Sequence, residues 1–256
     1  KDLTFTAARL DGYTARDSTD AQDIRVHCKN KRYACNVTAD HFDMYGFDYK
    51  INDQLTAQYH YAELEDIYRQ HFVGVVASQP LGEGVLKADL RLLKSADSGS
   101  ERAGSIDNRA LSGMLAYAIS GHTFSAGWQR MNGDNSMPYL DGSNPYLVNY
   151  VQVNDFAAAQ ERSWQLRYDY DFKAIGINGL SFLTRYVNGD HIKVLGSDQE
   201  GKEWERDSEL KYVIQTGTFK DVSLRLRNAT YRTNYEKFAR DVDETRLIVS
   251  YSFSVL

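Results

Sequence analysis

Hydrophobic and polar residues alternate with a period of two along most of this chain, which predicts β-strands with one apolar and one polar face. The clearest run spans Ser163 to Phe172, with aromatic and aliphatic residues at even positions and Arg, Asp, Gln and Ser at odd ones. Similar runs occupy 55–61, 86–92, 224–227 and 246–255. Helical periodicity does not persist over any useful length. The chain is therefore predicted to be all-β and antiparallel, with about fourteen strands.

Short and long connections alternate between these runs. Turn residues predict tight connections near Asn30, 52–53, 81–84, 120–121, 177–179 and 217–220, and polar composition predicts longer loops at 11–20, 94–105, 132–160, 188–203 and 233–244. Short turns at one rim and long loops at the other are typical of a transmembrane β-barrel.

The positions of the basic residues bear on the choice between a transmembrane barrel and a soluble β-sandwich. A Lys or Arg on the lipid face of a barrel costs roughly 2–4 kcal/mol at mid-membrane, so mid-strand cations must share the polar parity. Six of them do: Arg167, Arg185, Lys211, Arg225, Arg227 and Arg246. Four others share the apolar parity but fall near the loop-rich end, where long side chains can reach headgroups: Arg9, Arg109, Arg130 and Arg206. This pattern favours the barrel and leaves the sandwich as an alternative.

Composition is compatible with either architecture. The chain has 256 residues and 42% hydrophobic residues, its mean hydropathy is −0.54, and no apolar stretch is long enough for a membrane helix. The 18 Tyr residues carry rings with a polar tip, which suit a membrane interface. A net charge of −5 argues against a nucleic-acid partner.

The two cysteines, Cys28 and Cys35, flank residues 29–32, which we interpret as a hairpin turn. A turn centred on Lys31 and Arg32 would place the thiols opposite each other, where they could form a disulfide in an oxidising compartment. Two unpaired small side chains are an equal alternative, because hairpin register is not encoded in so short a segment.

Catalytic and metal-binding motifs are absent from the sequence. The six His are scattered without metal-ligand spacing, and neither a GxSxG elbow nor a phosphate-binding loop occurs. We therefore expect no enzyme activity, no cofactor and no metal. An outer-membrane barrel hydrolase remains an alternative function, because a catalytic triad is defined by geometry rather than by order in the chain. A soluble β-sandwich binding module is another.

Several ordered stretches resemble the OprD family of substrate-specific outer-membrane channels. They are residues 39–42 (ADHF), 46–50 (GFDYK), 59–70, 79–84, 146–156, 225–232 and 246–251. The resemblance implies a monomeric antiparallel barrel of about eighteen strands in the outer membrane of a Gram-negative bacterium. It also implies assembly by the outer-membrane machinery, and passage of small carboxylate-bearing solutes: basic amino acids in one subgroup, with which carbapenem entry is associated, and aromatic or cyclic carboxylates in another.

Members of that family are longer than this chain. Residues 1–256 are expected to form a single β-barrel domain corresponding to the C-terminal two thirds, without about four N-terminal strands of the family barrel. Whether such a shortened chain closes by itself is left open, because strand number, tilt and shear are linked.

The resemblance also implies a row of Arg and Lys along the lumen, which in this family forms the substrate track. The six cations of polar parity named above are the candidates for this basic ladder. Arg225 and Arg227 point the same way, roughly 7 Å apart, so that a carboxylate could pass from one guanidinium to the next. The alternative is that these cations pair with lumenal acids such as Asp169, Asp171 and Glu209.

Long loops narrow the pore in this family, and loop 132–160 is the candidate here because its second half is too apolar for a free loop. Its candidate constriction residues are Tyr139, Tyr146, Asn149, Tyr150 and Asp155. A loop packed on the rim is an equal alternative. Arg25 and His27 alternate with Ile24 and Val26, so they are further candidates for the pore lining.

Overall fold

The computed structural model describes residues 2–14, 18–235 and 239–253, and most of them belong to one twelve-stranded antiparallel sheet. Its strands are β1 (Leu3–Leu10), β6 (Phe42–Asn52), β7 (Leu55–Leu64), β8 (Tyr68–Leu81), β9 (Gly84–Asp97), β10 (Asp107–Ile119), β11 (His122–Asn132), β12 (Arg162–Asp171), β13 (Leu180–Lys193), β14 (Glu200–Val213), β15 (Ser223–Thr233) and β16 (Val242–Ser250). Each strand pairs with its neighbour in this order. The prediction of an all-β antiparallel chain is confirmed.

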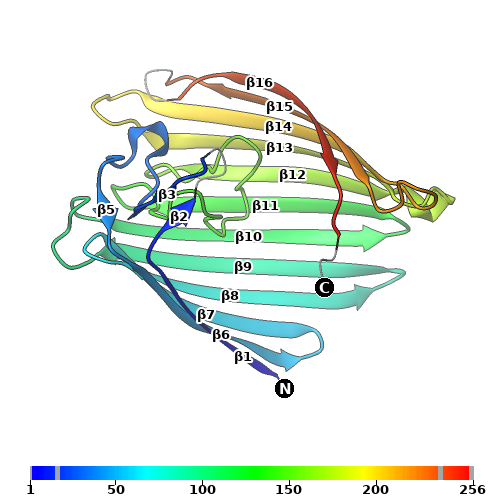
Figure 1. The fold of residues 1–256 in the computed structure, drawn as a ribbon, viewed down its shortest axis with the longest axis horizontal. Helices are drawn as coiled ribbons and strands as arrows, with labels where there is room; N and C mark the ends of the chain where they lie inside the picture. Colours follow the sequence, from blue (N-terminus) through cyan, green and yellow to red (C-terminus); the bar gives the residue numbers. More distant parts are fainter. Residues whose placement is uncertain (1, 15–17, 236–238, 254–256) are drawn as a thin grey trace.

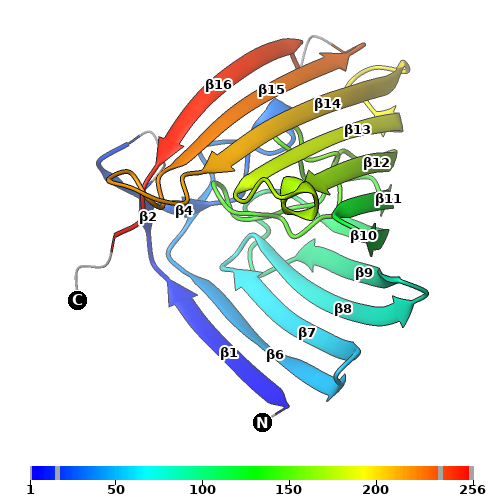
Figure 2. The same ribbon diagram turned by 90° about the vertical axis from the view of Figure 1, so that its right-hand side faces the viewer.

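The sheet is strongly curved but is not closed. Figure 1 shows the strands side by side, and Figure 2, a view along them, shows them curling around an interior that contains loop segments. Within the described residues, β1 and β16 are edge strands that do not pair with each other. The fold is therefore a wide part of a barrel wall.

Twelve strands, rather than about fourteen, form the sheet, because the described residues 11–14 and 18–41 lie outside it. They carry four two-residue strands, β2 (Tyr13–Thr14), β3 (Ala21–Gln22), β4 (Ile24–Arg25) and β5 (Thr38–Ala39), paired as β2–β3 and β4–β5. The turn predicted between Cys28 and Cys35 is present, because β4 and β5 pair antiparallel in a register centred on Lys31 and Arg32, with Ile24 opposite Ala39 and Arg25 opposite Thr38. The 3₁₀ helix η1 (Lys29–Lys31) occupies it, and Asn30 has a positive φ of 53°.

The predicted tight turns, apart from the one near Asn30, join strands at one rim. Ser120 and Gly121 connect β10 to β11 with φ of 48° and 82°, which is the backbone of a two-residue hairpin turn. The connection before β13 is longer than predicted, because it contains a second 3₁₀ helix, η2 (Phe172–Ile175).

Loop boundaries at the opposite rim were less accurate. The predicted loop 188–203 is mostly strand: β13 continues to Lys193, β14 begins at Glu200, and a register shift lies between Gly189 and Ile192. Likewise β9 extends to Asp97. Polar residues misled the prediction here because the strands have a polar inner face.

The two faces of the sheet differ in chemistry. The convex face exposes large apolar side chains, among them Phe5, Leu90, Leu115, Leu166 and Leu247, each more than half exposed. The concave face carries Gln, Ser, Asp, Glu, Arg and Lys on alternating positions of β12 to β16. No helix in the described residues is long and apolar enough to cross a membrane.

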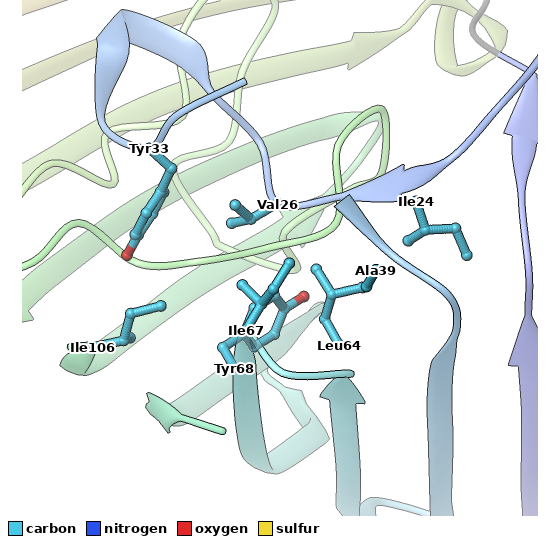
Figure 3. Close-up of a cluster of buried hydrophobic side chains, with 8 residues drawn as sticks. All are labelled: Ile24, Val26, Tyr33, Ala39, Leu64, Ile67, Tyr68 and Ile106. Carbon is cyan, nitrogen blue, oxygen red and sulfur yellow. The ribbon is translucent and has the colours of Figure 1, made fainter. Parts of the chain in front are cut away.

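The main apolar core lies at the loop-rich rim rather than inside the sheet (Figure 3). Residues 24–39 contribute Ile24, Val26, Tyr33 and Ala39, which pack on the β7–β8 turn at Leu64, Ile67 and Tyr68 and on Ile106. All eight side chains are at most 7% exposed. Burying each large one contributes roughly 1.5–3 kcal/mol, which holds residues 24–39 against the wall.

Candidate functional site: the concave face and its loops

The six candidate ladder cations all lie on the concave face, in three cross-strand pairs. Arg167 is opposite Arg185, Lys211 is opposite Arg225, and Arg227 is opposite Arg246. Like charges directly opposite each other destabilise a sheet. Three such pairs on neighbouring strands therefore need compensating negative charge.

Carboxylates on the same face supply part of that charge. Arg167 contacts both oxygens of Asp169 at 2.7 Å, and Arg185 Nε donates to Asp207 at 2.7 Å. Arg246 pairs with Glu244. The alternative of internal ion pairing thus holds for these three cations, and it extends to Arg225 and Arg227, which both contact Glu209.

The remaining three cations have only one carboxylate between them. Glu209 contacts Arg225 through Nε at 3.4 Å and also accepts from Arg227. Lys211 has no ion pair within the described residues. A surplus of positive charge therefore remains at the turn-side end of β14 and β15.

Two further cations of the concave face were missed as ladder candidates. Arg91 and Lys87 lie on β9, beside Asp89. Arg91 lies over the ring of Tyr146, 4.4 Å from its centroid, and donates to the Tyr146 carbonyl at 3.0 Å. Lys87 and Arg91 alternate with Leu86 and Leu90 in the sequence, and this alternation could have identified them as residues of the polar face.

Loop 133–161 folds against the concave face, and Asn149 is its buried anchor there. Asn149 Nδ2 donates to Ser163 Oγ at 2.8 Å, and its Oδ1 accepts from Gln165 at 3.0 Å. The Asn149 backbone N–H donates to Gln129 Oε1 at 3.2 Å. Side chains of β11 and β12 thus hold the middle of the loop against the concave face, whereas Leu140 packs on the apolar core at the rim.

A row of acids on β14 holds the next part of the loop through its backbone. Glu205 accepts from the N–H groups of Val153 at 2.7 Å and Asn154 at 2.8 Å. Glu203 accepts from the Asn154 side chain. Buried carboxylates gain most from such donors, so these acids act on the loop rather than on the open interior.

Residues 25–33 clamp the loop from its other side. Arg25 pairs with Asp141 at 2.7 Å, the Lys29 ammonium donates to the Val153 carbonyl at 2.7 Å, and Tyr33 OH donates to the Ser136 carbonyl at 2.5 Å. A disulfide joins Cys28 to Cys35, whose Cα atoms are 5.1 Å apart. The segment that carries these donors is thereby closed into a short loop.

Arg32 and Asp155 form a buried ion pair at the centre of this clamp. Their atoms Nη1 and Oδ1 are 2.7 Å apart, and the side chains are 6% and 0% exposed. Burial by itself would raise the pKa of Asp155, but the positive charges of Arg32 and Lys29 hold it below its ordinary value. Burial and the neighbouring Glu203 raise the pKa of Glu161. No sequence pattern pointed to Arg32.

Exposure separates the candidate constriction residues. Tyr146 and Tyr150 are 45% and 38% exposed, whereas His27, Tyr139, Asn149 and Asp155 are at most 8% exposed. His27 stacks on Tyr139 at 3.7 Å, and Tyr139 OH donates to Asp155 at 2.8 Å. The prediction that His27 lines the pore is wrong, because residues 26–28 belong to the clamp and not to a wall strand. Arg25 is committed to Asp141.

A cavity of about 440 Å³ lies between the concave face of β6–β9 and loop residues 139–146. Its lining is mostly apolar, including Phe42, Met44 and Phe72, with one carboxylate, Asp48. Asp48 accepts from Gln58 at 2.9 Å and lies 3.2 Å from His60 Nε2. No group of three or more His, Cys, Asp or Glu in the described residues could hold a metal ion.

A curved antiparallel sheet with an apolar convex face, a charged concave face and inward-folded loops has the architecture of an outer-membrane channel wall. The family model for the OprD family of outer membrane porins matches residues 1–255, and the chain belongs to that family. Membership of a porin family argues against the hydrolase alternative, and the sandwich alternative is excluded by the fold.

Two curated relatives are Porin D of Pseudomonas aeruginosa, 37% identical over 255 residues, and the porin-like protein GalP of Pseudomonas putida, 38% identical over 243 residues. The matches cover 90% and 94% of this chain, which spans 58% and 56% of the length of those relatives. Among solved structures, Pseudomonas aeruginosa OccK10 (OpdN) is 63% identical with a TM-score of 0.95, and the match covers 100% of this chain and 70% of that one. OccK5 (OpdH) is 58% identical with a TM-score of 0.92, covering 98% and 67%.

Proposed function

We propose that this chain forms part of the wall and constriction of an outer-membrane diffusion channel for small water-soluble solutes that bear a carboxylate. The observation that supports the proposal is the unbalanced charge at Lys211, Arg225 and Arg227, where Glu209 contacts the two arginines and Lys211 has no ion pair within the described residues. In a water-filled pore, the charges on the lining discriminate between solutes.

The arrangement supports exchange of one carboxylate for another. Arg225 and Arg227 are 30% and 31% exposed, so their guanidinium groups remain accessible while they contact Glu209. An arriving carboxylate can take over one guanidinium without a fully desolvated charge being left behind. Weak binding at successive cations lets a solute move on rather than remain trapped.

The opposite wall supports a solute with a second polar or cationic end. Asp48 is the one carboxylate in the cavity lined by Phe42, Met44 and Phe72, and it lies on β6, far around the sheet from β14 and β15. Basic amino acids and aromatic or cyclic carboxylates, with carbapenems as an extension, are the solute classes that we propose on this basis. The monomeric state and insertion by the outer-membrane assembly machinery belong to the same proposal.

The test is the double variant Arg225→Gln/Arg227→Gln in the intact protein. Neutralising both removes the surplus positive charge, so uptake of arginine and benzoate into liposomes should fall by roughly tenfold, and its dependence on ionic strength should weaken. Arg206→Gln is the matched control, because Arg206 lies on the convex face of the neighbouring strand and should leave uptake unchanged.

Unchanged carboxylate flux in the double variant would refute the ladder assignment. An equal loss for a neutral sugar of similar size would show that the arginines set pore width rather than solute charge. Heat-modifiable gel mobility verifies that each variant is folded.

A further inference from the structure

Cations on the convex face gather over four adjacent strands near the loop-rich rim. Lys94 is directly opposite Arg109, and Arg130 is directly opposite Arg162. Arg109 pairs with Asn132 and Arg130 with Leu111, so these two arginines are diagonal neighbours on β10 and β11. We name Lys94, Arg109, Arg130 and Arg162 the outer basic patch.

All four patch residues are exposed, and within the described chain none has a carboxylate within 4.0 Å. Three carboxylates lie around the patch: Glu63, which accepts from Tyr61 and Ser98; Asp107, two residues before Arg109 on β10; and Asp190, which is directly opposite Arg162 on β13 and contacts His191. Directly opposed like charges are unfavourable in a sheet, and Lys94, Arg109 and Arg130 have no carboxylate directly opposite them in the described chain. Binding of an external anion would therefore offset the repulsion between the cations of the patch.

The surroundings of the patch point to a lipid. Exposed apolar side chains continue the convex face from the patch along the same strands, including Leu92, Leu111, Trp128 and Trp164. Beside Lys94 is a hollow of about 350 Å³ lined by Tyr61, Arg69, His71, Lys94 and Ala96. An acyl-chain surface next to a cluster of guanidinium groups fits a molecule with a phosphate headgroup and an apolar body.

We propose that the outer basic patch binds the phosphate groups of a glycolipid headgroup in the outer leaflet. Arginine suits this task because its planar fork contacts two phosphate oxygens at once. This inference rests on the family's place in the outer membrane and is independent of the solute specificity proposed above.

The test is native mass spectrometry of the intact protein in detergent, titrated with lipid A that carries two phosphates, one phosphate or none. Binding should weaken with each phosphate removed. In the double variant Arg109→Gln/Arg130→Gln, binding of the two-phosphate form should weaken by roughly thirtyfold, because each cation near a membrane surface contributes about 1 kcal/mol.

Arg206→Gln is the control, because it removes an exposed convex-face arginine outside the patch, and it should bind as the unaltered protein does. Equal binding of phosphorylated and dephosphorylated lipid to the unaltered protein would overturn the proposal whether or not any variant folds. If inorganic phosphate displaced the lipid at equal concentration, the patch would be a site for free phosphate and not for a lipid. A similar loss of lipid binding in R206Q would show that the protein's net charge, and not the outer basic patch, determines binding.

Discussion

Burial determines the charge state of individual side chains in the clamp formed by residues 25–33. His27 lies between Tyr33 and Tyr139 with ring centroids 5.6 Å and 3.7 Å away, and it is 1% exposed. Such packing tolerates the neutral imidazole but not the charged one.

We expect His27 to stay neutral well into acid. Burial, with Arg32 and Lys29 nearby and Asp155 opposing them, lowers its pKa from 6.5 to about 3. Because the folded-state pKa is depressed, His27 adds stability above pH about 6.5, and this stability is lost as the pH falls toward 3. NMR titration of ¹³C-labelled histidines, with His27→Gln for assignment, should show one imidazole that does not titrate above pH 5. Titration of that signal near pH 6.5 would contradict the burial.

The Arg32–Asp155 pair should be costly to break on one side. Arg32→Gln leaves a buried carboxylate without its partner, so the free energy of unfolding in detergent should fall by roughly 3–5 kcal/mol. Arg9→Gln breaks the ion pair between the exposed Arg9 and Asp43, and it should change the free energy of unfolding little. Urea titrations of the two variants make the comparison, and equal effects would show that burial is not the cause.

At the scale of elements, the loops depend on the wall and on each other. The acids of β14, the amides of β11 and β12 and the clamp at residues 25–33 all contact loop 133–161. The wall strands need no such help, since each of them pairs with the next in the sheet order from β1 and β6 to β16.

Removing the disulfide should loosen the constriction rather than the barrel wall. Cys28 and Cys35 are seven residues apart, and closing so short a loop contributes about 2.5 kcal/mol in the chain-entropy model. Cys28→Ser/Cys35→Ser should therefore increase current noise in single-channel recordings and speed amide exchange in residues 25–35 and 149–156. Exchange in β8 to β10 serves as the internal reference, and a parallel rise there would indicate global destabilisation instead.

At the scale of the molecule, the described sheet has two free edges, β1 and β16. Backbone groups at a strand edge within a bilayer must find partners. The chain spans 58% of the length of Porin D. That relative therefore has residues beyond those that match this wall.

Residues 1–256 by themselves should therefore give no steady conductance in a planar bilayer, because a sheet with two free edges does not enclose a lumen. The longer relative OccK10 is the comparison. Discrete openings that arginine or benzoate interrupts would show instead that the twelve strands close without help.

Alternating polarity and the turn-forming residues together were enough to predict the all-β antiparallel fold, the positions of most turns and the concave parity of Arg167, Arg185, Lys211, Arg225, Arg227 and Arg246. These features depend on the two-residue period of a strand, which is local. Boundaries such as those of 188–203 could not be predicted, because a polar strand facing a polar interior has the same composition as a loop.

The tertiary structure decided which polar residues are free and which are committed. Arg32 meets Asp155 across 123 residues, and Glu205 meets the backbone of Val153 and Asn154 across 52 and 51. No local pattern encodes contacts over such separations, because they depend on how a loop folds back across a curved sheet. The sequence by itself determined the wall of this protein, and the packing of its loops decided what the wall surrounds.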